Sequence, residues 1–248
     1  MIDAERCRNL INKDVGRICG MFKWAAGNEI LPVAVHQALT TVPGLAKGRH
    51  PEVKEAEPVT PVPEGHVWAV HAIVPPRIRA MIELQWWTGM RPGEVVLMKA
   101  EDIDRSGEVW VYSPESHKRE HHDLPRPIAI GPKAQGVLAA WIGNARVDAY
   151  LFSPKDAMAA RKVRPEMIEP GDHYRVSSYR NAVRRACKRL AIPVWFPNQL
   201  RHNAATRVRH RFGLEASRAV LGHETVDTTQ IYAEKDREEA KRIMREVG

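Results

Sequence analysis

Apolar residues recur along most of this chain at the spacing of α-helices. Near the N-terminus, Ile18, Met21, Phe22 and Ala25 stand at positions i, i+3, i+4 and i+7, and this pattern predicts a helical region over residues 9–46. Later segments with helical patterns are RIRAMIELQWWT, PKAQGVLAAWIGNA, SSYRNAVRRACKRLA, NQLRHNAATRVRHR, LEASRAVLG and DTTQIYAEKDREEAKRIMREV.

Local signals indicate where several of these helices begin and end. Gly89 is expected to end RIRAMIELQWWT as an amphipathic helix, and Pro92 stands near the first turn of another helix in RPGEVVLMK. Asp227 can cap the start of the last helix.

Two short segments are rich in β-forming residues instead. GEVWVYS and RPIAIG are joined by the charged stretch SPESHKREHHDLP, which predicts a β-hairpin with a long loop. One small antiparallel sheet among many helices indicates an α+β, mainly α fold rather than a doubly wound parallel sheet.

A proline-rich stretch separates two parts of the chain. The segment KGRHPEVKEAEPVTPVPEGH contains four prolines that block regular helix and sheet, so we expect a polar, semi-extended linker there. The predicted organisation is a partial helical region over residues 1–48, a linker over 49–66 and a larger domain over 67–248.

The composition argues against a membrane protein and against a disulfide-stabilised secreted one. No apolar run approaches the length of a membrane span, and the N-terminus has no apolar signal region. Cys7, Cys19 and Cys187 are odd in number and widely spaced, which argues against a disulfide framework or a zinc site. We therefore expect a cytoplasmic location.

The net charge of +8 is unevenly distributed. Residues 174–218 contain eleven Lys or Arg against one acid, Glu215, so this segment is +10 and the rest of the chain sums to −2. A block of one sign on predicted helices favours a polyanionic partner, above all nucleic acid, although a basic surface that serves solubility remains open. The candidate nucleic-acid contacts are Arg180, Arg184, Arg185, Lys188, Arg189, Arg207 and Arg209.

Five motifs follow one another in a distinctive order. WTGMRPGEV is followed by SHKRE in the hairpin loop, then by NQLRHNAATRV, LGH and DTTQIY. This ordered set, from about residue 78 to 238, resembles the tyrosine recombinase (phage integrase) family. The resemblance implies that family's catalytic domain, preceded here by a shortened helical core-binding region.

The resemblance also implies a chemistry. Tyr232 matches the nucleophile that forms a 3′-phosphotyrosine link to DNA, a step that conserves bond energy and needs no cofactor. Arg91 and Arg201 match the arginines that hold the phosphate oxygens, and His223 matches a further hydrogen-bond donor to them. Lys118 matches the general acid that protonates the departing 5′-oxygen.

Three further positions complete or depart from this pattern. Glu94 and His202 match residues that support the arginines and histidines. Asn198 stands where the family pattern usually has a histidine; its amide can donate a hydrogen bond to a phosphate oxygen but cannot act as a general base. The expected partners are double-stranded DNA, further copies of the chain in a tetramer on paired sites, and a DNA-bending accessory protein.

Each of these residues taken alone has an ordinary explanation. A single tyrosine on a helix is usually a packing residue, and Trp86 and Trp87 are expected in the core rather than stacked on bases. No metal site is expected from His117, His121 and His122 in the charged loop. Two other functions remain open: a catalytically impaired DNA-binding remnant, and a helix-turn-helix regulator that would leave Lys118 and TTQIY unexplained.

Overall fold

The computed structural model describes residues 6–114, 127–143, 149–159, 170–222 and 230–247. The chain divides into two compact units, Met1–Val59 and Thr60–Gly248. The point of division lies inside the proline-rich stretch. Each unit is described by itself below.

The N-terminal unit contains two helices, α1 (Arg8–Gly27) and α2 (Val33–Thr40). The helical region predicted over residues 9–46 thus consists of two helices with a break between them. Glu29 adopts a left-handed backbone conformation with φ of 59°, and Pro32, which has no N–H to donate, immediately precedes α2. Asn12 then joins α1 to the returning chain, since its amide both donates to and accepts from the backbone of Leu45 at 3.0 and 2.8 Å.

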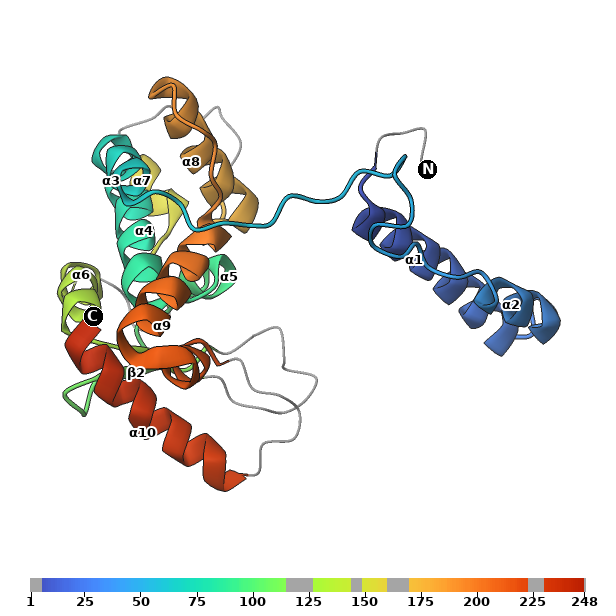
Figure 1. Cartoon of the computed structure of the whole chain (residues 1–248). Coiled ribbons are helices and arrows are strands. Elements are labelled where there is room, and N and C mark those ends of the chain that lie inside the picture. Colours follow the sequence, from blue (N-terminus) through green and yellow to red (C-terminus); the bar gives the residue numbers. More distant parts are fainter. Residues whose placement is uncertain (1–5, 115–126, 144–148, 160–169, 223–229, 248) are drawn as a thin grey trace. The chain divides into compact units, whose positions relative to one another are not determined.

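The second unit has helices packed around a small sheet (Figure 1). Its elements are α3 (Glu64–Ile73), α4 (Pro76–Thr88), α5 (Pro92–Val96), β1 (Ile103–Asp104), β2 (Trp110–Tyr112), β3 (Ile128–Ile130), α6 (Pro132–Ile142), α7 (Pro154–Ala159), α8 (Val176–Arg189), α9 (Pro197–Leu221) and α10 (Gln230–Val247). The predicted fold class, α+β and mainly α with a small antiparallel sheet, is confirmed.

The sheet has the order β1-β2-β3 and is antiparallel throughout. The predicted hairpin is confirmed, because β2 pairs with β3 in a register that places Trp110 opposite Ile130 and Tyr112 opposite Ile128. β1 was not predicted, and at two residues it is too short to show an alternating pattern. The charged hairpin loop lies outside the described residues.

Helix α4 is the central helix of this unit. It contacts α3, α5, α6, α9 and β3, and it runs between α6 and α9 in Figure 1. Gly89 ends α4 as predicted, with a left-handed φ of 68°. The expected amphipathic character is wrong, however: Ile78, Met81 and Leu84, at most 2% exposed, are only part of a helix that is buried on most sides. The Trp86 indole belongs to this core, as expected, and the partly buried Trp87 indole packs against it.

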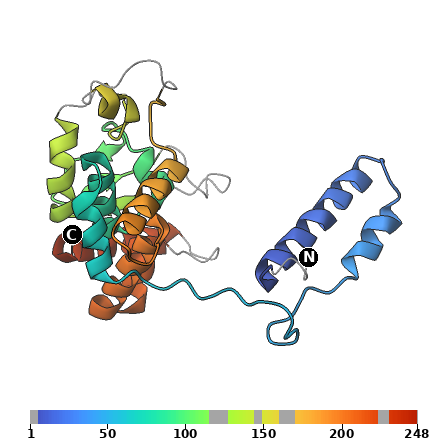
Figure 2. The same ribbon diagram turned by 90° about the horizontal axis from the view of Figure 1, so that it is seen from above.

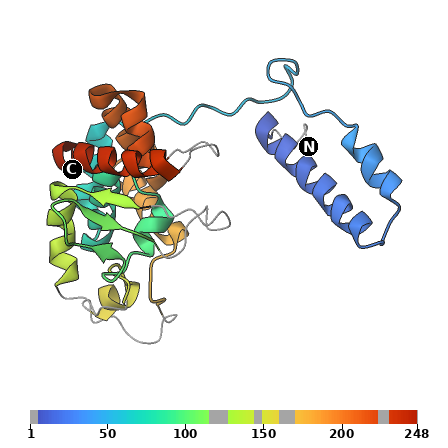
Figure 3. The ribbon, with the colours of Figure 1, turned by 90° about the horizontal axis from the view of Figure 1, so that it is seen from below.

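Helix α9 changes direction at Gly213, whose φ of 89° and ψ of 179° are not helical. The kink separates the two helical segments expected there. Helix α10 packs along α9 and beside β3 (Figures 1 and 3), where Ile243 and Val247 join Val208 and Ala216 in an apolar cluster. The apolar face of α10 is thus covered within the same chain. Helix α8 contacts α3, α5 and α9 (Figure 2), and it lies at the opposite end of the unit from α10 in Figure 1.

Candidate active site

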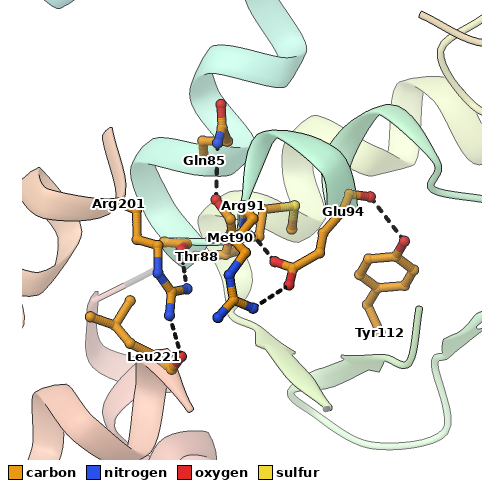
Figure 4. Close-up of polar contacts among 9 residues, drawn as sticks. Gln85, Thr88, Met90, Arg91, Glu94, Tyr112, Arg201 and Leu221 are labelled. Carbon is orange, nitrogen blue, oxygen red and sulfur yellow. Dashed lines mark hydrogen bonds and ion pairs between the residues drawn. The ribbon is translucent and has the colours of Figure 1, made fainter. Parts of the chain in front are cut away.

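The loop between α4 and α5 is held by polar contacts with the last turn of α4 (Figure 4). Gln85 donates from Nε2 to the carbonyl of Met90 at 2.9 Å, and the Met90 N–H donates to the Thr88 hydroxyl at 3.2 Å. Two features favour a glycine at position 89. Its backbone has a left-handed φ of 68°, and a Cβ atom there would lie 2.6 Å from Cδ2 of Leu221. The next residue after this fixed turn is Arg91.

Arg91 and Glu94 bind each other twice. The Arg91 N–H donates to Oε2 of Glu94 at 2.5 Å, and its Nη1 donates to Oε1 at 2.9 Å. The Glu94 side chain is 4% exposed, whereas 26% of the Arg91 side chain is exposed. Tyr112, in β2, donates its hydroxyl to the Glu94 carbonyl at 2.9 Å, and burial raises the pKa of this phenol. The sheet therefore anchors the helix turn that orients Arg91.

Arg201 approaches the same loop from α9. Its Nη1 donates to the Gly89 carbonyl at 2.8 Å and its Nη2 to the Leu221 carbonyl at 2.5 Å (Figure 4). Burial lowers the pKa of Arg201 to about 10, the nearby charge of Arg91 contributes to that lowering, and Glu94 opposes both effects. At neutral pH the group stays charged. Two cations with one carboxylate, largely shielded from water, form a site that favours an additional anion.

The other predicted catalytic residues are only partly visible in this arrangement. Lys118 and His223 lie outside the described residues, as does the proposed cap Asp227. Tyr232 belongs to the first turn of α10, and its side chain is outside what the structure describes. The carbonyl that Arg201 holds belongs to Leu221, two residues before His223 in the chain.

Two of the supporting residues lie on the same helix as Arg201. Asn198 and His202 belong to the first turns of α9, and both side chains are exposed. Glu94 is thus the supporting residue that the described structure brings into direct contact with a predicted catalytic arginine. The roles of Asn198 and His202 stay predictions.

Most of the candidate nucleic-acid contacts share one exposed face. Helix α8 buries Tyr179, Val183, Ala186 and Cys187 and leaves its basic side chains in solvent. The exposed basic residues among the candidates are Arg180, Arg184, Arg185, Lys188 and Arg189 on α8 and Arg209 on α9.

Arg207 departs from this set. Its guanidinium lies 4.5 Å from the ring centroid of Trp86 and 5.4 Å from that of Trp87, and it donates to the Trp86 carbonyl. The expectation that Arg207 faces nucleic acid is therefore corrected: the side chain turns inward onto α4. Its spacing along α9 cannot reveal this, because the choice of face depends on where α4 packs.

Sequence reasoning missed residues that act by holding others. Besides Gln85 and Tyr112, Asn203 bonds in both directions with the backbone of Val62, at 2.9 and 2.7 Å, and so attaches the end of the proline-rich stretch to α9. The contacts of Tyr112 and Asn203 join residues that are 18 and 141 positions apart, and no local pattern signals them.

Within the described ranges, no three His, Cys, Asp or Glu side chains are grouped so that they could hold a metal ion. The three loop histidines, His117, His121 and His122, lie outside those ranges. Of the helices that are described, none combines the length and the apolar character needed to cross a membrane.

Comparison with known proteins gives one family match and several relatives. The model of the phage integrase family matches residues 70–239. The tyrosine recombinase XerC of Yersinia pestis is 30% identical over 172 residues, which are 64% of this chain and 48% of that protein. XerC of Bifidobacterium longum subsp. infantis is 29% identical over 167 residues, 66% of this chain and 45% of that protein. The chain thus spans about half the length of the curated relatives that it matches.

Solved structures share the fold at low sequence identity. The Tn1549 transposon integrase, solved as a single-residue variant in complex with a circular intermediate DNA, aligns with a TM-score of 0.62 and 14% identity, over 95% of this chain and 81% of that one. The integrase from mycobacterium phage Brujita aligns with a TM-score of 0.56 and 15% identity, over 97% and 72%.

Proposed function

The chain belongs to the phage integrase family, and on that premise we propose that it is a site-specific recombinase that breaks and rejoins double-stranded DNA. The observation that carries the proposal is the pairing of Arg91 with Arg201. The guanidinium groups of Arg91, just before α5, and of Arg201, in α9, lie at one loop, and a buried carboxylate, Glu94, holds the first of them. Such a site suits a phosphodiester, whose negative charge increases in the transition state.

The chemistry follows from the roles that the family resemblance implies. The phenol oxygen of Tyr232 attacks the scissile phosphorus and gives up its proton to water, and the bond to the 5′-oxygen breaks as Lys118 gives that oxygen a proton. The product is a 3′-phosphotyrosine and a free 5′-hydroxyl. The 5′-hydroxyl of another strand then attacks the phosphotyrosine and releases Tyr232. Arg91, Arg201 and His223 stabilise the charged phosphoryl oxygens in both steps.

The exposed basic face of α8 supports a duplex DNA partner. The side chains of Arg184 and Arg185 are both exposed and suit phosphate contacts, which hold DNA without reading its sequence. The Tn1549 integrase was solved with DNA. Strand exchange between two sites requires several copies of the enzyme, so we propose a tetramer on paired sites, with an accessory protein that bends the DNA as a further partner.

A second candidate, a DNA-binding remnant with impaired catalysis, is favoured by Asn198. This residue stands exposed in the first turn of α9, near Arg201, where the family pattern has a histidine. An amide can donate to a phosphate oxygen, but it cannot accept the tyrosine proton as a base.

One experiment separates the two candidates. The protein is incubated with a pool of nicked duplexes of random sequence, in which cleavage near the nick releases a short strand and traps the covalent adduct. A recombinase forms adducts that survive SDS and EDTA. Tyr232→Phe should form none, whereas the control Tyr150→Phe should behave like the unmodified protein. DNA binding without any adduct from the unmodified protein would favour the remnant, and adducts from Tyr232→Phe would remove Tyr232 from its role.

A further inference from the structure

The last turn of α4 presents backbone carbonyls that have no partner within the helix, as every helix end does. Two arginines of α9 supply donors to this end. Arg201 donates to the Gly89 carbonyl, and Arg207, six residues further along α9, donates to the Trp86 carbonyl. Cations at a helix C-terminus are also favoured by the helix dipole. The end of α4 is therefore attached to α9 at two points.

Arg207 is held in place by aromatic rings as well. Its guanidinium lies over Trp86 and Trp87, and Nζ of Lys133, from α6, lies 4.3 Å from the Trp87 ring centroid. Lys133 also donates to the carbonyl of Val247, the last residue of α10, at 3.3 Å. Trp87 thus lies among cations from α9 and α6, close to where the helix that carries Tyr232 ends.

This arrangement is costly for the fold. The atoms Nε and Nη1 of Arg207 are buried and have no hydrogen-bond partner among the described residues, and burial lowers the pKa of the group to about 10. An apolar side chain of similar length would fill the space without burying a charge. What Arg207 adds, and an apolar residue cannot, is a directed bond that fixes the position of α4 along α9.

That position matters for the pair of catalytic arginines. Arg91 follows Trp86 by five residues and Gly89 by two, and Arg201 is on the same helix as Arg207. A shift of the α4 end along α9 would therefore move Arg91 relative to Arg201. Displacements of about 1 Å in a preorganised site can cost roughly 100-fold in rate.

We propose that Arg207 is a positioning residue for DNA cleavage, which sets the placement of Arg91 relative to Arg201 by holding the last turn of α4 on α9. The inference rests on the proposed function for its effect on cleavage. The placement of the last turn of α4 by Arg207 does not depend on that function and can be measured separately.

The test compares Arg207→Met and Arg207→Lys with the unmodified chain and with a control, Arg242→Met, which removes an exposed arginine paired with Glu239 on α10. Single-turnover cleavage is measured on a duplex recovered from the adducts of the random pool, and on the same duplex with a methylphosphonate at its scissile position. That group carries less negative charge, so it depends less on well-placed arginines. We expect Arg207→Met to cleave the ordinary duplex about 10- to 100-fold more slowly. Arg207→Lys should recover part of the rate, because lysine can still donate to the Trp86 carbonyl.

The deficit of Arg207→Met should shrink on the methylphosphonate, and DNA affinity should not change. An equal deficit on both substrates, or none, overturns the proposal. Hydrogen exchange at the backbone amides of residues 89–94 gives a second readout that needs no catalysis. We expect faster exchange there in Arg207→Met and unchanged exchange in α1. Unchanged exchange at residues 89–94 overturns the proposal, whether or not the unmodified chain forms an adduct. Absence of an adduct from the unmodified chain would instead contradict the proposed function.

Discussion

The guanidinium of Arg201 donates a 2.8 Å hydrogen bond to the backbone carbonyl of Gly89, across 112 residues of sequence. This bond links the turn before Arg91 to the helix that carries the second arginine. Gly89 is itself under two constraints, because its φ is 68° and a Cβ atom would contact Leu221 at 2.6 Å. Two motifs that are distant in sequence, the turn at Gly89 and the start of α9, are therefore in direct contact.

Loss of the Arg201 side chain should affect catalysis more than DNA binding. Arg201→Ala removes a preorganised cation and leaves the Gly89 and Leu221 carbonyls without this donor. We expect cleavage to fall about 100- to 1000-fold and the free energy of unfolding to fall by about 1–3 kcal/mol. Single-turnover cleavage and denaturant unfolding measure the two effects. A variant that cleaves at the unmodified rate would contradict the role of Arg201.

Substitution of Gly89 tests the turn itself. Gly89→Ala places a side chain in a left-handed conformation and against Leu221, so we expect a loss of at least about 1 kcal/mol in the free energy of unfolding. Gly136→Ala is the matched control, since Gly136 lies in α6 and an added Cβ meets nothing within 4 Å. It should stabilise the chain by about 0.4–1 kcal/mol. Equal effects from the two substitutions would show that the turn is not constrained.

Glu94→Gln tests the buried carboxylate. The amide of glutamine has one acceptor oxygen and a nitrogen that only donates, so it cannot accept from both the Arg91 N–H and its Nη1. Misplacement of Arg91 should slow cleavage by about 10- to 100-fold, while the affinity for random duplex DNA stays unchanged. Glu239→Gln, which weakens an exposed ion pair with Arg242, serves as control and should leave cleavage as it is. Unimpaired cleavage by Glu94→Gln would mean that Arg91 needs no such support.

The proposed role of Lys118 as general acid can be tested although the residue lies outside the described ranges. Lys118→Ala should slow cleavage of an ordinary phosphodiester, but far less so of a 5′-phosphorothiolate, whose sulfur leaves without a proton. Initial rates on the two substrates give the comparison. If both are slowed equally, Lys118 is a phosphate contact and not an acid.

The basic face of α8 predicts a steep salt dependence of DNA binding. Each phosphate contact adds about −0.9 to the slope of log K against log salt, and we expect roughly four to seven contacts. Joint replacement of Arg184 and Arg185 by alanine should make the slope shallower by about one to two units, in a salt titration with random duplex DNA. Arg242→Ala, on α10, should leave the slope unchanged. A flat slope for the unmodified chain would show that this face does not contact DNA.

Features that depend on a few neighbouring residues could be predicted from the sequence. Gly89 ends α4, since a glycine readily takes the left-handed conformation there, and the β-forming runs around the charged loop pair as a hairpin. The break before Pro32 was missed because apolar residues keep their helical spacing on both sides of it. The ordered motifs were sufficient to identify the family.

Many local structures, the family, and the types of residue that the family's chemistry requires can thus be predicted from the sequence. Which side chains meet depends on tertiary packing. Arg184 and Arg207 are both arginines on basic helices, yet one is exposed and the other turns inward onto Trp86. The physical reason is that burial and hydrogen-bond partners depend on the face that a helix packs against its neighbours. That face is selected by the whole core around α4, and no short stretch of sequence contains it.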